Sequence, residues 1–130
     1  MGTWGLGNFE NDSAMDFIDE EIDRHVAAIE AIFADGDRFR LDEDAEGELM
    51  PRVAILSFLC RDCGGVFNTA PGHMADVGAW KARYLQMYDD QIDGMEPRGD
   101  FKAQRRAVIA DTFDRLIKLQ KLQHRQPAEK

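Results

Sequence analysis

Apolar side chains recur every three or four residues in the first third of the chain, which is the spacing of one face of an α-helix. This pattern begins after Asn11, Asp12 and Ser13, three residue types that often cap helices, and stops at the sequence 35–37, Asp-Gly-Asp. Ser13 with Asp16 approximates a capping box. We predict a first helix that ends near residue 34. Its apolar positions are Phe17, Ile18, Ile22, Val26, Ile29, Ile32 and Phe33.

A second apolar run, from Val53 to Cys60, is hydrophobic on nearly all sides and predicts the central, most buried helix. Pro51 costs about 3 kcal/mol inside a helix but is tolerated in its first turn, so we place the start near Met50. A kinked helix that begins near Asp42 is the alternative. A strand fits the run, but its length and the neighbouring helical patterns disfavour it. The glycines at 64 and 65 end this helix.

Two further helices follow a loop over residues 66–75. The third runs from about Asp76, an N-cap residue, to Ile92, and its stripe is Val77, Trp80, Tyr84, Tyr88 and Ile92. The fourth follows a turn at 97–100 and runs from Phe101 to about Leu122. On one side it places Phe101, Val108, Ile109, Phe113, Leu116 and Ile117. Residues 124–130 form a frayed tail. We therefore predict an all-α bundle of about four main helices, folded as one domain over 1–130.

An N-terminal arm, residues 1–12, alternates bulky apolar residues with glycines at 2, 5 and 7. Large side chains on so permissive a backbone need pockets, so we expect Trp4, Leu6 and Phe9 to anchor the arm on the bundle. A glycine-rich loop beside a helix N-terminus can also hold an anion. The arm has no lysine, however, and Glu10 and Asp12 repel phosphate, which favours the structural interpretation.

This opening segment resembles that of a bacterial family known as a domain of unknown function, whose members begin Met-Gly-x-Trp-Gly-x-Gly-x-Phe-x-Asn-Asp. The residues that match this pattern include Trp4, Phe9, Asn11 and Asp12, and the resemblance covers residues 1–17. It implies a small helical bacterial protein. It brings no activity, cofactor or catalytic residue.

Composition excludes several classes of protein. With 130 residues, 44% hydrophobic and 32% charged, the chain can bury a core and is not disordered throughout. No run of about 18 apolar residues predicts a membrane span, and the first residues lack the basic and apolar stretches of a signal peptide. We therefore expect a cytoplasmic protein that does not act in a membrane.

Charge is distributed unevenly. The formal net charge is −9; residues 1–60 hold 15 acidic and 4 basic residues, whereas residues 61–130 hold 10 acidic and 12 basic residues. An acidic excess of this kind attracts a basic partner over long range, although a solvated surface is the simpler interpretation. Nucleic-acid binding is not expected, because it requires clustered lysine and arginine.

Cys60 and Cys63 have the spacing of a redox pair or of half a zinc site. A redox pair belongs at a helix N-terminus, where the helix dipole lowers the thiol pKa, but this pair follows a helix beside Asp62. A second pair of zinc ligands is also missing. We therefore expect Cys60 to be a core residue and Cys63 a loop thiol, with no metal and no cofactor.

Clustered carboxylates leave two hypotheses for function. The first is a non-enzymatic interaction domain that binds a basic protein partner, such as a toxin enzyme that it neutralises, through Asp16, Asp19, Glu20 and Asp23. The second is a metal-dependent enzyme whose carboxylates converge between the first and third helices, with Asp89 or Asp93 as partners. The Glu-x-x-His motif of di-iron bundles is absent. Outward-pointing carboxylates would favour the first hypothesis and a buried cluster the second.

Overall fold

The computed structural model describes residues 5–65 and 76–124, and within these ranges the regular elements are all helices. This confirms the predicted all-α fold with four main helices. The elements are α1 (Asp12–Ala34), the π-helical turn η1 (Ala45–Leu49), α2 (Met50–Asp62), α3 (Val77–Gln91), the 3₁₀ turn η2 (Ile92–Met95) and α4 (Phe101–His124). None of these helices is long and apolar enough to cross a membrane.

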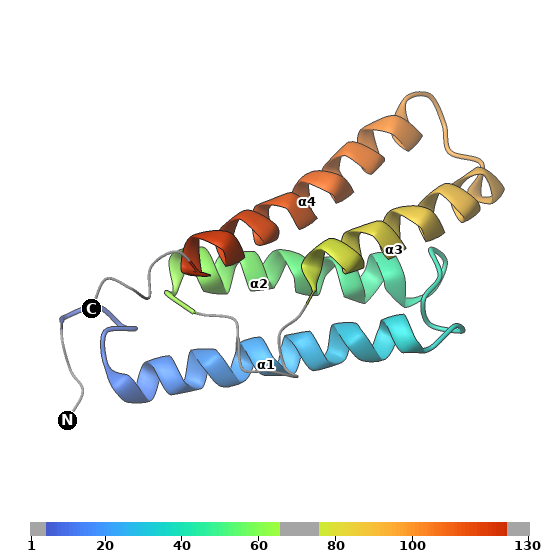
Figure 1. The fold of residues 1–130 in the computed structure, drawn as a ribbon. Coiled ribbons are helices and arrows are strands. Elements are labelled where there is room, and N and C mark those ends of the chain that lie inside the picture. The colour runs from blue at the N-terminus through green and yellow to red at the C-terminus, as the bar shows by residue number, and fades with distance from the viewer. Residues whose placement is uncertain (1–4, 66–75, 125–130) are drawn as a thin grey trace.

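α2 packs against both α1 and α4, which lie on opposite sides of the bundle in Figure 1. α1 lies along α2, while α3 lies against α4. Each helix contributes fully buried side chains to one core, among them Ile22 and Ile29 of α1, Leu56 of α2, Tyr84 of α3 and Phe113 of α4. Burial of such side chains is the main force that holds the bundle together.

Polar side chains start two of the helices. The Asn11 side chain accepts a hydrogen bond from the backbone N–H of Ala14 at 2.8 Å, and Asp76 accepts one from Ala79 at 3.0 Å. The predicted cap at Asp76 is therefore confirmed. At the first helix, Asn11 is the cap and Asp12 and Ser13 already lie in the first turn, so the predicted capping box on Ser13 is wrong. The extended backbone at Asn11 turns into the helix before Ser13 is reached.

The predicted start of α2 near Met50 is confirmed, and the π-helical turn η1 comes directly before it, so helical backbone begins between Met50 and the alternative start near Asp42. The N–H of Met50 donates to the carbonyl of Ala45, five residues earlier, in place of the usual four. Pro51 has no N–H, and its ring crowds the carbonyl four residues before it. A widened π-turn absorbs both effects without ending the helix.

Several predicted core positions are exposed. Phe17 of α1 and Phe101 and Val108 of α4 point to solvent, and so do Ile55 and Phe58 of α2. On each helix the apolar positions span a wider arc than the neighbouring helices can cover, so the side chains at the edges of that arc are exposed to solvent. The expectation that α2 is buried nearly all round is therefore wrong, although it does lie between α1 and α4.

The predicted stripe on α3 is confirmed, since all five of its residues are buried. Its aromatic members join a cluster from four parts of the chain. The ring centres of Trp80 and Phe33 are 6.2 Å apart, those of Tyr84 and Phe39 are 6.0 Å apart, and those of Tyr84 and Phe113 are 5.8 Å apart. Such pairs stabilise a fold by about 0.5–1.5 kcal/mol each beyond their burial. They fix α3 against α4 and against the end of α1.

The described part of the arm does not pack as predicted. Leu6 is fully exposed, which contradicts its expected role as an anchor, while Trp4 lies outside the described residues. Phe9 is 38% exposed and lines a hollow with Met15 of α1 and with Cys63 and Gly64 at the end of α2. Within the arm, the Glu10 carboxylate accepts a hydrogen bond from the backbone N–H of Gly7 at 3.1 Å, which forms a local turn.

A substitution at Gly65 tests the contact between α1 and α2, because Gly65 lies close to Ile18 and Ile22 of α1. A Cβ atom there would lie 2.4 Å from Ile22 Cδ1, 2.9 Å from Ile18 Cγ2 and 3.0 Å from a backbone oxygen. Gly65→Ala should lower the free energy of unfolding by about 1–3 kcal/mol in urea denaturation, because the two helices must separate slightly. Gly47→Ala, where a Cβ meets nothing within 4 Å, is the control and should cost nothing. Equal stability of the two variants would contradict this packing.

Candidate functional site

The four carboxylates predicted to bind a partner lie together on one exposed face of α1. We call Asp16, Asp19, Glu20 and Asp23 the acidic face; all four are exposed. Asp16 and Glu20 are one helical turn apart, as are Asp19 and Asp23, so like charges are neighbours along the helix. The buried side of the same helix, with Ile18 and Ile22, packs on the core.

Most of this charge is not neutralised within the described chain. Asp16, Glu20 and Asp23 form no ion pair with any described residue. The cation nearest to them in sequence, Arg24, is itself held by Glu21. Exposed like charges repel each other by a few tenths of a kcal/mol per pair, which a cationic partner would relieve.

Asp89 of α3 and Asp93 of η2 differ, because α4 supplies a cation to each of these two carboxylates. Arg106 donates two hydrogen bonds to Asp89, at 2.8 and 2.9 Å, and Lys102 donates to Asp93 at 2.8 Å. The hydrogen bond from Arg106 holds the pKa of Asp89 below its ordinary value. Among the described residues, no group of three or more His, Cys, Asp or Glu side chains could hold a metal ion. The metal-enzyme hypothesis therefore finds no support in these helices.

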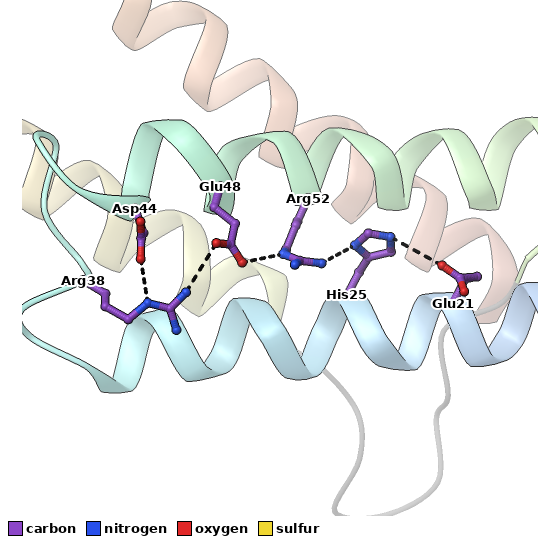
Figure 2. A network of polar contacts seen from close by, with 6 residues as sticks. All are labelled: Glu21, His25, Arg38, Asp44, Glu48 and Arg52. Carbon is purple, nitrogen blue, oxygen red and sulfur yellow. Dashed lines mark hydrogen bonds and ion pairs between the residues drawn. The ribbon is translucent and has the colours of Figure 1, made fainter.

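A second polar network joins α1 to α2 behind the acidic face (Figure 2). Glu48 lies between two arginines: Arg52 Nε donates to it at 2.9 Å and Arg38 Nη2 at 3.4 Å. Arg38 also donates to Asp44 at 2.6 Å. At the other end, Arg52 Nη1 reaches His25 of α1 at 2.9 Å. The contact between His25 and Arg52 lets the network connect η1 and α2 to the middle of α1.

His25 is the group in this network that titrates near neutral pH. Arginine can only donate, so His25 Nδ1 is the acceptor and the ring is neutral. Burial, followed by the charge of Arg52, lowers the pKa of His25 from its ordinary 6.5, while Glu21, 4.0 Å from Nε2, acts in the opposite direction. The folded protein thus favours the neutral ring.

Glu46 makes a third polar contact, which the sequence did not predict. Tyr84 of α3 donates its hydroxyl hydrogen to Glu46 Oε2, and Arg105 Nε of α4 donates to Oε1 at 2.7 Å. Tyr84 is fully buried, and burial together with this hydrogen bond raises the pKa of its hydroxyl. The π-turn at η1 brings Glu46 between these two helices, so the local distortion has a structural use.

Among the described residues neither cysteine forms a disulfide, and both are buried. This agrees with the prediction of Cys60 as a core residue. Cys63, predicted as a loop thiol, instead ends α2 as its buried C-cap residue. Burial, and then the charge of Asp62, raise the pKa of Cys63, so its reactive thiolate form is disfavoured. The absence of a zinc site at this pair stays a prediction.

A hollow of about 550 Å³ lies between the segment that follows α1 and the end of α3. It opens widely to solvent, and its polar lining is Arg40, Asp42, Asp90 and Gln91. No His, Cys or Ser lines it, so it presents no nucleophile with an adjacent base. The acidic face remains the strongest candidate site.

A protein-family model described as "Domain of unknown function (DUF4259)" matches residues 2–120. The chain belongs to this family. The match confirms the resemblance seen in the first 17 residues and extends it over all four helices. For this DUF4259 domain, comparison with curated proteins and with solved structures found no match.

The state of His25 predicts a pH dependence of stability. Its pKa is lower in the folded than in the unfolded chain, so stability is full above the ordinary value of 6.5 and falls as the pH drops below it. We expect the free energy of unfolding of the DUF4259 domain to decline between about pH 7 and pH 5. His25→Gln, which can still accept from Arg52, should flatten this decline. An unchanged slope in the variant would show that other groups cause it.

The contact at Glu46 predicts a large effect of one substitution. Glu46→Ala leaves the Tyr84 hydroxyl and the Arg105 guanidinium without their acceptor, and should cost about 1–3 kcal/mol in chemical denaturation. Glu43→Ala, which removes an exposed carboxylate that forms no ion pair, is the matched control and should stay within about 0.5 kcal/mol of wild type. Similar losses in both variants would contradict a structural role for Glu46.

Proposed function

We propose that this DUF4259 domain is a non-enzymatic interaction domain that binds a basic protein partner through the acidic face of α1. The observation that carries this proposal is the contrast in charge pairing. Asp89 of α3 and Asp93 of η2 have cations of the same chain beside them, whereas Asp16, Glu20 and Asp23 have none among the described residues. Lysine and arginine side chains of a partner are the natural groups to fill this role.

Two further features support a protein partner. The net charge of −9 attracts a basic surface over long range and raises the rate of encounter. Phe17 is exposed and lies one turn from Glu20 on the same helix, so an aromatic side chain is placed beside the carboxylates. Exposed aromatic side chains commonly supply the apolar part of an interface, while charges around them fix its orientation. A basic toxin enzyme covered by this domain is one partner of this chemistry.

A charge-reversal experiment tests the proposal. In the triple variant Asp16→Lys, Glu20→Lys, Asp23→Lys, the fold should be unchanged or slightly more stable, because repulsion along α1 is removed. The variant should no longer capture from a native-host lysate the basic protein that the wild type captures. Capture by the wild type should weaken steeply between about 0.1 and 1 M salt, as the screening length falls from about 10 to 3 Å.

The matched control reverses three other exposed carboxylates, Asp37, Glu43 and Glu96, which also form no ion pair with described residues. This control changes the net charge by the same amount and should still capture the partner. If the α1 variant retains the partner at low salt, or if both variants lose it equally, the acidic face is not the binding surface.

A further inference from the structure

The exposed side of α3 forms one wall of another hollow, of about 530 Å³. We call it the α3 hollow; its lining residues are Phe39, Ala82, Arg83, Gln86, Met87, Asp90 and Gln91. The opposite side of α3 is buried, with Tyr84 and Tyr88 in the core. All of the lining except Phe39 comes from α3, so the hollow is an open face of one helix.

Arg83 is a cation of this face that no described carboxylate neutralises. It donates Nη2 to the backbone oxygen of Phe33 at 2.9 Å, and its guanidinium carbon lies 4.8 Å from the centre of the Phe33 ring and 5.6 Å from that of Phe39. These contacts hold the side chain in place, because a guanidinium stacks on aromatic rings. No ion pair with a described residue accompanies them.

Asp90 is the corresponding carboxylate at the other end of the hollow. Among the described residues it accepts a hydrogen bond from the Gln86 amide at 3.5 Å and has no cation beside it. Arg40 lines the neighbouring hollow together with Asp90, but Arg40 is paired with Asp42. The α3 hollow therefore carries one positive and one negative side chain, each without an ion-pair partner in the described chain.

The positions of these two charges make the face complementary to itself. Arg83 and Asp90 are about two helical turns apart, or roughly 10 Å along the helix, and their midpoint lies between Gln86 and Met87. A two-fold axis through this midpoint places a second α3 antiparallel to the first. Arg83 of each copy then lies opposite Asp90 of the other. In a parallel pair in register, like charges would face each other, so the charges select the antiparallel arrangement.

We propose that the α3 hollow is the interface through which two copies of this DUF4259 domain form a dimer, with their α3 helices antiparallel. Such an interface uses the same patch on both copies, as in most homodimers. The rotation also sets Ala82 opposite Gln91, so that a small side chain faces a long one. One helix from each copy makes a small interface, in which charge pairs fix the orientation. This inference concerns α3 and goes beyond the binding of a basic partner by α1.

Sedimentation of the full-length protein at concentrations up to about 1 mM tests the proposal, since this range reaches weak complexes. The mass of the wild type should rise from one copy toward two. Asp90→Lys, which leaves the contacts of Arg83 with Phe33 in place, should weaken the association at least about tenfold, because like charges then face each other twice. Glu30→Lys changes the net charge equally at an exposed position without an ion pair, and should dimerise like the wild type.

A mixture of two variants is the sharper test. Arg83→Glu leaves two carboxylates on the face and Asp90→Lys leaves two cations, so each variant alone should be a monomer. An equimolar mixture should form a heterodimer of about wild-type affinity, because every cation then faces a carboxylate. Lys118→Glu, at an exposed position outside the hollow, is the control and should not rescue Asp90→Lys. Circular dichroism establishes that each variant is folded.

Three outcomes would overturn the proposal: a wild type that stays monomeric throughout, an Asp90→Lys variant that dimerises as well as Glu30→Lys, or a mixture of folded variants that stays monomeric. If Arg83→Glu does not fold, the comparison of Asp90→Lys with Glu30→Lys decides. The triple charge reversal on α1 should still dimerise, so failure of the acidic-face proposal and failure of this one are distinguishable.

Discussion

The cations of α4 are the constraint on which the later part of the bundle depends. Arg105, Arg106 and Lys102 reach carboxylates on η1, α3 and η2 respectively, so one helix forms ion pairs with three other elements. The contact of Arg105 with Glu46 matters most, because Glu46 also accepts from the buried Tyr84 hydroxyl. Exposed pairs contribute little individually, whereas a half-buried carboxylate with two donors is costly to leave unpaired.

Because these cations pair with carboxylates of the bundle, few of them are left to pair with the exposed carboxylates of the surface. Residues 1–60 hold only 4 basic residues, and the two arginines nearest to η1, Arg38 and Arg52, are taken up by Asp44 and Glu48. Among the described residues, no cation pairs with Asp16, Glu20 or Asp23 of α1.

Local patterns in the sequence were enough for the helices and for part of the site. The cap at Asp76 and the stripe through Trp80 and Tyr84 depend on residues within a few turns, and the exposure of the acidic face follows from the apolar face opposite. The contact of Glu46 with Arg105 could not be predicted, because these residues are 59 positions apart and a π-turn aligns them. Leu6 was misjudged because a hydrogen bond within the arm replaces a pocket. Phe101 and Val108 were placed with the core positions of α4 because their spacing fits a helical face, but both are exposed.

The central claim is that Asp16, Glu20 and Asp23 gather unneutralised negative charge on one face of α1, and this claim can be measured without a partner. Amide protons relax faster near a nitroxide, and a comparison of cationic with anionic nitroxides in NMR reports the local electrostatic potential at each residue. The account predicts the most negative potential along α1 around Asp16, Glu20 and Asp23, and a weaker one beside Asp89 and Asp93, where α4 supplies cations. A potential along α1 no more negative than that along α3 would contradict it.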